Sequence, residues 1–255
     1  MVDVKRVRSD IILESVSFML ERFQQRIREK SEHVDAAPVL IIPFGDSVTQ
    51  GCMEANVIDH AGVYHNQLKQ KLEAEYPQTT FSIINAGVSG ASAESSLGRL
   101  ERDVIRHNPD LVMLGFCLND ACAGLEKLDC FEQNIRRMVR EIRENTSADI
   151  VLLTPNFMAS VETSRIAEVH KPYAATIIAC QNRGVLKVYV ERLRELASEL
   201  EIPLADVYAE WEKLHAAGVD TTALLSNGLN HPDAERQLLI AETIFTLITQ
   251  AHPEN

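Results

Sequence analysis

Apolar and polar positions alternate along the chain in blocks that predict strands and helices in turn. Short apolar runs of the kind found in buried strands cover residues 39–45, 81–86, 110–116, 149–154 and 202–207. Apolar residues at helical spacing cover 61–75, 93–107, 128–145, 186–200 and 234–250. Strands and helices that alternate in this order predict the α/β fold class, with a doubly wound, mostly parallel sheet flanked by helices.

A further amphipathic helix is predicted at residues 10–30, ahead of the first strand. Its apolar stretch is interrupted by Glu14 and followed by charged residues, which fits neither a signal-peptide core nor a membrane span. We therefore expect an N-terminal helical extension, residues 1–37, joined to one domain at residues 38–255. The helix is expected to pack on its own domain, and a homo-oligomer formed through it is the alternative.

Composition indicates which binding partners and which cellular compartment suit this protein. The formal net charge of −12 argues against binding to nucleic acid or to an anionic membrane. Five cysteines, an odd number with no CxxC spacing, suit a reducing compartment better than a disulfide framework. Together with the N-terminal pattern, this predicts a cytoplasmic protein.

The most informative segment is the first apolar run, which ends at Gly45, Asp46 and Ser47. Ligands of open α/β sheets collect at the carboxyl ends of the strands, so Ser47 would lie where a substrate binds. Gly-Asp-Ser is also ordinary turn chemistry, and taken alone it leaves a plain turn as the alternative.

Three later blocks place further chemistry at the same edge of the sheet. The segment 81–90 runs into Gly90, where the backbone can approach a ligand closely and an N–H can face a developing oxyanion. The strand at 110–116 is followed by Asn119, an amide donor, and Asp120. Near the C-terminus, a loop carries His231 just before the last helix. Each block alone also fits a turn, a cap or a solvated side chain.

Four such blocks in this order resemble the SGNH hydrolases, the GDSL esterase/lipase family. The resemblance implies a flavodoxin-like three-layer α/β/α domain over residues 38–255. It also implies that Ser47 is the nucleophile and His231 the general base, and that no metal or cofactor takes part.

The resemblance assigns the remaining residues of the blocks as well. The backbone N–H groups of Ser47 and Gly90 and the side-chain amide of Asn119 would form an oxyanion hole. The carboxylates of Asp46 and Asp120 would brace their loops and take no part in the reaction.

One position departs from the family pattern. Most members carry an Asp three residues before the catalytic His, and here that position is Gly228. A carboxylate there fixes the tautomer of the imidazole and stabilises the imidazolium, whereas a neutral acceptor fixes only the tautomer. We expect the Asn227 side chain or a main-chain carbonyl to orient His231. Three carboxylates are ranked behind them: Asp206, Asp220 and Asp233.

The chemistry expected from these residues is acyl transfer from a small-molecule ester. His231 would take the Ser47 proton and later return it to the leaving alcohol. Short acyl groups, such as acetyl on a carbohydrate or another small alcohol, are favoured. The missing Asp motivates one alternative from another class, a catalytically impaired ligand-binding protein of the same fold.

Overall fold

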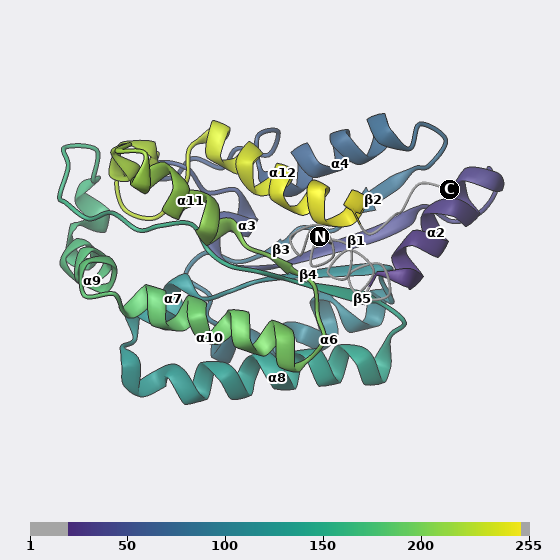
Figure 1. Cartoon of the computed structure of the whole chain (residues 1–255), viewed down its shortest axis with the longest axis horizontal. Helices are drawn as coiled ribbons and strands as arrows, with labels where there is room; N and C mark the ends of the chain where they lie inside the picture. The colour runs from purple at the N-terminus through teal and green to yellow at the C-terminus, as the bar shows by residue number, and fades with distance from the viewer. Residues whose placement is uncertain (1–19, 251–255) are drawn as a thin grey trace, which may run out of the picture.

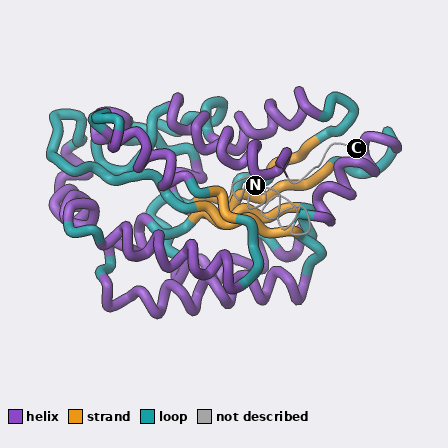
Figure 2. The backbone as a smooth tube through the Cα atoms, in the orientation of Figure 1, coloured by secondary structure: helices purple, strands orange, loops and turns teal. Residues whose placement is uncertain are grey.

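The computed structural model describes residues 20–250 and contains one central, fully parallel sheet between two layers of helices (Figures 1 and 2). Its strand order is β2-β1-β4-β5-β6, and the short strand β3 also pairs with β1. The strands are β1 (Val39–Gly45), β2 (Phe81–Ile83), β3 (Ala86–Gly87), β4 (Leu111–Gly115), β5 (Asp149–Leu153) and β6 (Leu204–Ala205). The predicted fold class is confirmed.

The helices lie on both faces of this sheet. On one face α4 packs against α12, and on the other α10 packs against α8 (Figure 1). The α-helices are α2 (Glu21–Glu32), α3 (Ser47–Gln50), α4 (Tyr64–Glu75), α5 (Ala93–Ser96), α6 (Leu100–Asp103), α7 (Leu118–Cys122), α8 (Leu128–Asn145), α9 (Lys171–Asn182), α10 (Val185–Glu199), α11 (Val207–Ala216) and α12 (Ala234–Gln250). Within residues 20–250, no helix has the length and apolar character needed to cross a bilayer.

Some predicted elements differ from those in the structure. The continuous helix predicted at 93–107 is wrong: α5 and α6 alternate there with two single 3-10 turns, Leu97–Arg99 and Ile105–His107. The strand predicted at 81–86 is split into β2 and β3, and the last strand is only two residues long because α11 begins at Val207. Of the N-terminal helix predicted at 10–30, residues 10–19 lie outside the described part of the chain.

The described N-terminal helix, α2, packs on the domain at the amino ends of the strands. Phe23 and Ile27 are buried in the main hydrophobic core. The Phe23 N–H donates to a carboxylate oxygen of Asp149, the first residue of β5, at 2.7 Å. The Arg26 guanidinium donates to Asp110 at 2.9 Å, just before β4. The candidate site lies at the opposite, carboxyl ends of the parallel strands.

Candidate active site

The candidate nucleophile lies at the sharp turn between β1 and α3. The side chain of Asp46 caps α3 by accepting a hydrogen bond from the Val48 N–H at 2.9 Å. Burial raises the pKa of Asp46 to about 7. Ser47 is the first residue of α3 and is only 3% exposed. Its hydroxyl is therefore fixed at the carboxyl end of the central strand.

Ser47 and His231 meet although 184 positions separate them in the sequence. The Nε2 atom of His231 lies 3.0 Å from the Ser47 Oγ, within the reach required of a general base. On its other side, the Nδ1 atom lies 2.7 Å from the main-chain carbonyl of Met53. Because a carbonyl oxygen only accepts, Nδ1 carries the proton and Nε2 is free to accept the Ser47 proton.

A short hairpin-like loop after α3 presents the Met53 carbonyl. The Met53 N–H donates to the Val57 carbonyl at 2.9 Å, and Cys52 pairs with Ile58 in an antiparallel bridge. The Asp59 N–H donates to the carbonyl of Gly51 at 2.9 Å and closes the loop. The acceptor for His231 is thus held by a hydrogen-bonded segment of the main chain.

Asn227 organises the histidine loop and does not touch the imidazole ring. Its side-chain oxygen accepts hydrogen bonds from the N–H groups of Leu229, Asn230 and His231, each at 3.0 Å. The side-chain nitrogen of Asn227 donates to the Asn230 side chain at 3.0 Å. Of the two acceptors expected for the ring, the Asn227 side chain and a main-chain carbonyl, the structure shows the carbonyl, that of Met53.

The three carboxylates considered as further candidates to orient His231 all have other partners. Asp206 accepts from the Ala209 N–H and pairs with Arg194. Asp220 caps a 3-10 turn at Thr221–Leu224, and Asp233 accepts from the Arg236 N–H in the first turn of α12. No hydrogen bond joins any of them to His231 within residues 20–250.

Gly228, at the position of the family Asp, cannot carry a side chain without strain. Its φ is +68°, and a Cβ there would lie 2.5 Å from the Thr163 hydroxyl oxygen and 3.2 Å from the Arg165 Cβ. The local backbone therefore disfavours any side chain at this position, and a main-chain carbonyl serves as the acceptor for Nδ1.

The three candidate oxyanion donors retain free N–H groups. The N–H groups of Ser47 and Gly90 find no acceptor within residues 20–250. Asn119, in α7, donates one amide hydrogen to the Ala91 carbonyl at 2.9 Å, which leaves its second hydrogen available. The same bond fixes Asn119 to the residue that follows Gly90.

Glycine in the second block permits close packing against the nucleophile turn. A Cβ on Gly87 would lie 2.2 Å from the main-chain nitrogen of Gln50 in α3. The Gln50 side chain in turn accepts from the Ser89 N–H at 2.7 Å. The second block is therefore fixed directly to the helix that begins with Ser47.

Asp120 connects the second block to the third. One carboxylate oxygen accepts from the Ala93 N–H at 2.9 Å, and the other accepts from the Cys117 N–H at 3.1 Å. Burial raises the pKa of Asp120 to about 6. Cys117 has a φ of +131°, a strained value for a residue with a side chain. The Asp120 carboxylate thus holds the loop that leads into Asn119.

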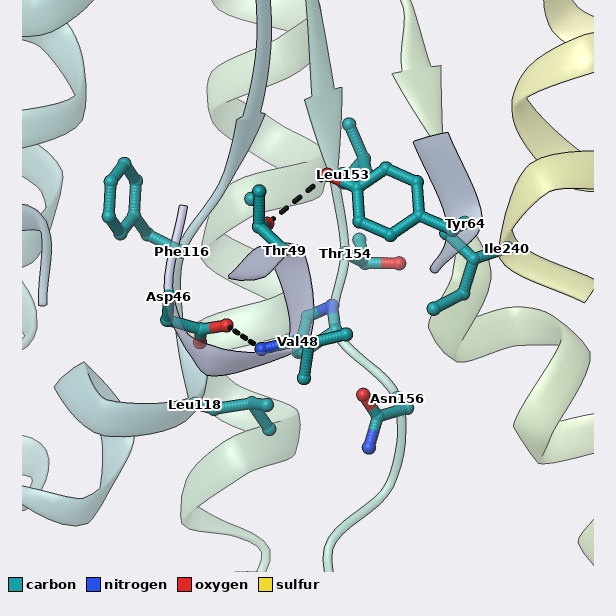
Figure 3. Close-up of a pocket in the computed structure, with 12 residues that line it drawn as sticks. Asp46, Val48, Thr49, Tyr64, Phe116, Leu118, Leu153, Thr154, Asn156 and Ile240 are labelled. Carbon is teal, nitrogen blue, oxygen red and sulfur yellow. Dashed lines mark hydrogen bonds between the residues drawn. The ribbon is translucent and has the colours of Figure 1, made fainter. Parts of the chain in front are cut away.

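A small cavity lies beside the nucleophile turn. Figure 3 shows Val48 beside Asp46, with the side chains of Leu118 and Asn156 below it. The cavity holds about 30 Å³. Since a water needs roughly 10–15 Å³, this volume accommodates two or three waters at most.

Sequence reasoning missed Asn156, which connects the loop after β5 to the histidine loop. It is 1% exposed, and its side-chain nitrogen donates to the carbonyls of Phe157 at 2.8 Å and Asn230 at 3.0 Å. It lies in none of the four blocks, and no local pattern around it indicates this contact.

The electrostatic setting keeps His231 neutral. Burial lowers its pKa below the ordinary histidine value, and the hydrogen bond with the Met53 carbonyl opposes this shift without cancelling it. A neutral imidazole is the form that can accept a proton from a hydroxyl. Geometry and protonation therefore agree: this site can activate Ser47 for attack on a carbonyl carbon.

Comparisons with known proteins connect this geometry to a family. The model of the GDSL-like Lipase/Acylhydrolase family matches residues 44–237. An acetylxylan esterase from Geobacillus stearothermophilus is 26% identical over 115 residues, which cover 42% of this chain and 52% of the esterase. The alignment spans about half the length of that relative.

Solved structures share the fold at low sequence identity. An acetylxylan esterase from Geobacillus stearothermophilus has a TM-score of 0.64 at 19% identity, with 86% of this chain and 96% of that chain covered. A lipase/acylhydrolase from Enterococcus faecalis has a TM-score of 0.62 at 23% identity and covers 85% and 98%. An alpha/beta hydrolase enzyme from the metagenome of Lake Arreo has a TM-score of 0.65 at 21% identity and covers 86% and 98%.

These neighbours have the three-layer α/β/α architecture of SGNH hydrolases and confirm the predicted fold. The family match, which includes all four blocks, confirms the resemblance drawn from the sequence. Since that match covers more than half of the chain, this protein belongs to the GDSL-like lipase/acylhydrolase family.

Proposed function

We propose that this protein is a serine esterase that forms an acyl-enzyme on Ser47, with His231 as the general base. The observation that carries the proposal is the 3.0 Å contact between Ser47 Oγ and His231 Nε2, on an imidazole whose Nδ1 proton is fixed by Met53. A serine hydroxyl is a weak nucleophile until a neighbouring base takes its proton, and this arrangement supplies that base.

The reaction proceeds in two acyl transfers. His231 takes the Ser47 proton as Oγ attacks the ester carbonyl carbon, and the carbonyl oxygen becomes an oxyanion. Collapse of this intermediate breaks the bond to the alcohol, which leaves with the proton from His231. A water then attacks the acyl-enzyme with His231 again as base, and releases the acid and free Ser47.

The oxyanion is stabilised by the N–H groups of Ser47 and Gly90 and by the free amide hydrogen of Asn119. Preorganised donors of this kind act in a site with little water, and loss of one typically costs about a hundred- to a thousand-fold in turnover. Asn119→Ala should therefore reduce kcat more than it changes KM. Asp46 and Asp120 support the two loops that carry the donors.

We propose a Ser–His pair completed by a carbonyl in place of a carboxylate. The Met53 carbonyl fixes the tautomer, which prevents the loss seen when a serine protease presents the wrong nitrogen to its serine. It contributes less stabilisation of the imidazolium than a carboxylate, because it carries no full charge. Turnover is supported chiefly by orientation and by the oxyanion donors.

The substrate proposed is a small-molecule ester with a short acyl group, such as acetyl on a carbohydrate. The acetylxylan esterase among the relatives supports it. The acidic net charge of −12 supports a neutral substrate over nucleic acid or an anionic membrane.

The setting proposed is a reducing, cytoplasmic one, supported by the free state of the five cysteines. An oligomer through the N-terminal helix has less support, because the apolar residues Phe23 and Ile27 of α2 are already buried in its own domain. Size-exclusion chromatography with light scattering distinguishes a monomer from a dimer.

Ester hydrolysis across acyl lengths tests the proposal. We expect wild type to hydrolyse p-nitrophenyl acetate faster than longer esters, and Ser47→Ala and His231→Ala to lose nearly all of this activity. Asn227→Ala should lower kcat through the histidine loop, whereas Asn227→Asp, which keeps the acceptor oxygen, should retain more of it.

A serine-reactive organophosphonate provides an independent readout. Labelling of Ser47 supports the proposed nucleophile. Wild type that is as slow as Ser47→Ala on every ester, with Ser47 unlabelled, would leave the ligand-binding protein as the better description.

A further inference from the structure

A second, larger cavity opens beside the candidate oxyanion donors. It holds about 240 Å³, and both Gly90 and Asn119 line it. It extends from them between the first turn of α5 and the first half of α8, where Ser92, Lys127 and Asn134 contribute to its wall. Pockets for small organic ligands typically start at roughly 300 Å³, so this volume suits a group no larger than one or two rings.

Two opposite charges on the wall of this cavity have no ion-pair partner in the described part of the chain. Glu94, in α5, and Lys127, just before α8, are both exposed and line the cavity. Neither forms an ion pair or a side-chain hydrogen bond with any residue of the described range 20–250. Their hydrogen-bonding capacity is therefore available to a ligand.

Asn134 adds a mixed donor and acceptor to the same wall. Its side-chain nitrogen donates to the Cys130 sulfur at 3.4 Å, and its side-chain oxygen is unused within the described residues. Carboxylate and amide oxygens accept hydrogen bonds, while an ammonium group donates them. A ligand that satisfies all three must both donate and accept at neighbouring positions, as vicinal hydroxyl groups do.

Other ligand classes fit this wall less well. An anion such as a phosphate would meet Glu94 and the buried carboxyl of Asp120, which also lines the cavity and would repel it. A long acyl chain would remove the Lys127 and Glu94 charges from water without compensating hydrogen bonds. A neutral polyol avoids both costs.

The geometry of an ester directs its alcohol part toward this cavity. In the preferred Z conformation, the alcohol carbon lies on the same side of the C–O bond as the carbonyl oxygen. With that oxygen held by the donors at Gly90 and Asn119, the alcohol part projects along the cavity that both residues line. The acyl methyl then points away from it.

We propose that the cavity between α5 and α8 binds the sugar ring of the substrate, with Lys127, Glu94 and Asn134 hydrogen-bonded to its hydroxyl groups. This inference rests on the proposed esterase function and adds to it a recognition site for the alcohol. It makes the enzyme selective for acetylated polyols over acetates of the same size that lack hydroxyls.

Two matched substrates test this: a methyl pyranoside monoacetate and cyclohexyl acetate, which have six-membered rings with and without hydroxyls. The quantity measured is the ratio of kcat/KM for the sugar acetate to kcat/KM for cyclohexyl acetate. In Lys127→Met and in Glu94→Met, which replace each charged side chain with an unbranched apolar one of similar size, we expect this ratio to fall roughly tenfold or more, because each loses a charged hydrogen bond. The matched control is Lys69→Met, on α4 at the opposite face of the sheet (Figure 1), which should keep the wild-type ratio.

The outcomes separate this inference from the function it rests on. A ratio within about twofold of wild type in both cavity variants overturns the sugar site, while Ser47-dependent hydrolysis of cyclohexyl acetate still supports the esterase. If Ser47→Ala hydrolyses both esters as fast as wild type, the proposed function fails and the sugar site fails with it. Calorimetric titration of Ser47→Ala with the sugar acetate, with and without Lys127→Met, should show the same weakening without turnover.

Discussion

At the scale of single residues, the acceptor behind His231 controls the acidity of the imidazole. A carboxylate in that position raises the pKa of a histidine, because it stabilises the charged form. The Met53 carbonyl has no full charge, and burial lowers the pKa of His231 below 6.5 in spite of its hydrogen bond. The base is therefore neutral over a wider range of pH than it would be beside a carboxylate.

A pH profile tests this consequence. We expect the acid limb of kcat/KM for p-nitrophenyl acetate to be centred below about pH 6.5, the ordinary histidine value, since a lowered pKa preserves the neutral base at lower pH. Asp46, whose pKa is raised to about 7, titrates nearby, so Asp46→Asn is the control. Its amide oxygen still accepts from the Val48 N–H. An acid limb centred above pH 7 in both proteins would contradict the assignment to His231.

An Asp at position 228, where most family members carry one, should not improve this enzyme. Gly228→Asp places a side chain at a φ of +68°, with its Cβ 2.5 Å from the Thr163 hydroxyl oxygen. We expect a loss of about 1–3 kcal/mol in the free energy of unfolding and no gain in kcat. Gly228→Ala carries the same Cβ without the carboxylate and should be destabilised to a similar extent in urea. A faster Gly228→Asp enzyme would show that a carboxylate can displace the Met53 carbonyl from Nδ1.

At the scale of elements, the sequence predicted regular segments well and interrupted ones poorly. The periodicity at 128–145 and 234–250 coincides with α8 and α12, which are long and have one buried face. The segment 93–107 has the same apolar spacing, but the chain bends there through two 3-10 turns. Within this segment Arg99 makes tertiary contacts with Gly45 and Ala86, which no local sequence pattern discloses.

The residues of the candidate site likewise divide into those that the sequence predicted and those that only the fold reveals. Ser47, Gly90, Asn119 and His231 follow strands or precede a helix, so their positions in the sheet could be inferred from the chain. The acceptor at Met53 is a main-chain atom, which every residue possesses, and only the folded loop determines which carbonyl faces Nδ1. Asn156 was missed because its partner carbonyl at Asn230 lies 74 positions away.

Arg99 ties the nucleophile strand to the second block. Its guanidinium donates to the carbonyls of Gly45 at 2.9 Å and Ala86 at 2.7 Å, and to Asp103 at 3.2 Å. It also lies over the Phe44 ring, 4.2 Å from the centroid. One planar cation therefore satisfies the carbonyl at the carboxyl end of β1, next to Ser47, and a carbonyl of β3.

Arg99→Lys should be costly although it keeps the charge. A single ammonium cannot reach all these acceptors, so we expect a loss of about 2–3 kcal/mol in unfolding free energy and a lower kcat. Arg102→Lys is the control, because the Arg102 side chain is 64% exposed and, among residues 20–250, pairs only with Asp103. We expect that change to leave the unfolding free energy close to that of wild type. Equal losses in both variants, measured in urea, would refute a special role for Arg99.

At the scale of the whole molecule, α2 closes the end of the sheet opposite the site. The division into an extension at 1–37 and a hydrolase domain at 38–255 stays a prediction, and the family match begins only at residue 44. The described helix nevertheless contributes to the same core as the sheet, and its Gln24 side chain donates to the Ile248 carbonyl in α12 at 2.9 Å. We therefore expect α2 to unfold together with the sheet and not before it.

Substitutions in the ion pair between Arg26 and Asp110 test whether α2 and the sheet unfold together. Their side chains are 10% and 12% exposed, and Asp110 also accepts from the Leu40 N–H at 2.8 Å in β1. Arg26→Met leaves a buried carboxylate without its cation, which should lower the unfolding free energy by about 3–5 kcal/mol. The double variant with Asp110→Asn should lose less stability, because the amide oxygen still accepts from the Leu40 N–H and no charge is left unpaired.

Since α2 lies at the amino ends of parallel strands and Ser47 at the carboxyl end of β1, kcat of the folded fraction should stay unchanged in both variants. A separate early transition for α2 in the urea curve of wild type would instead make it an independent extension.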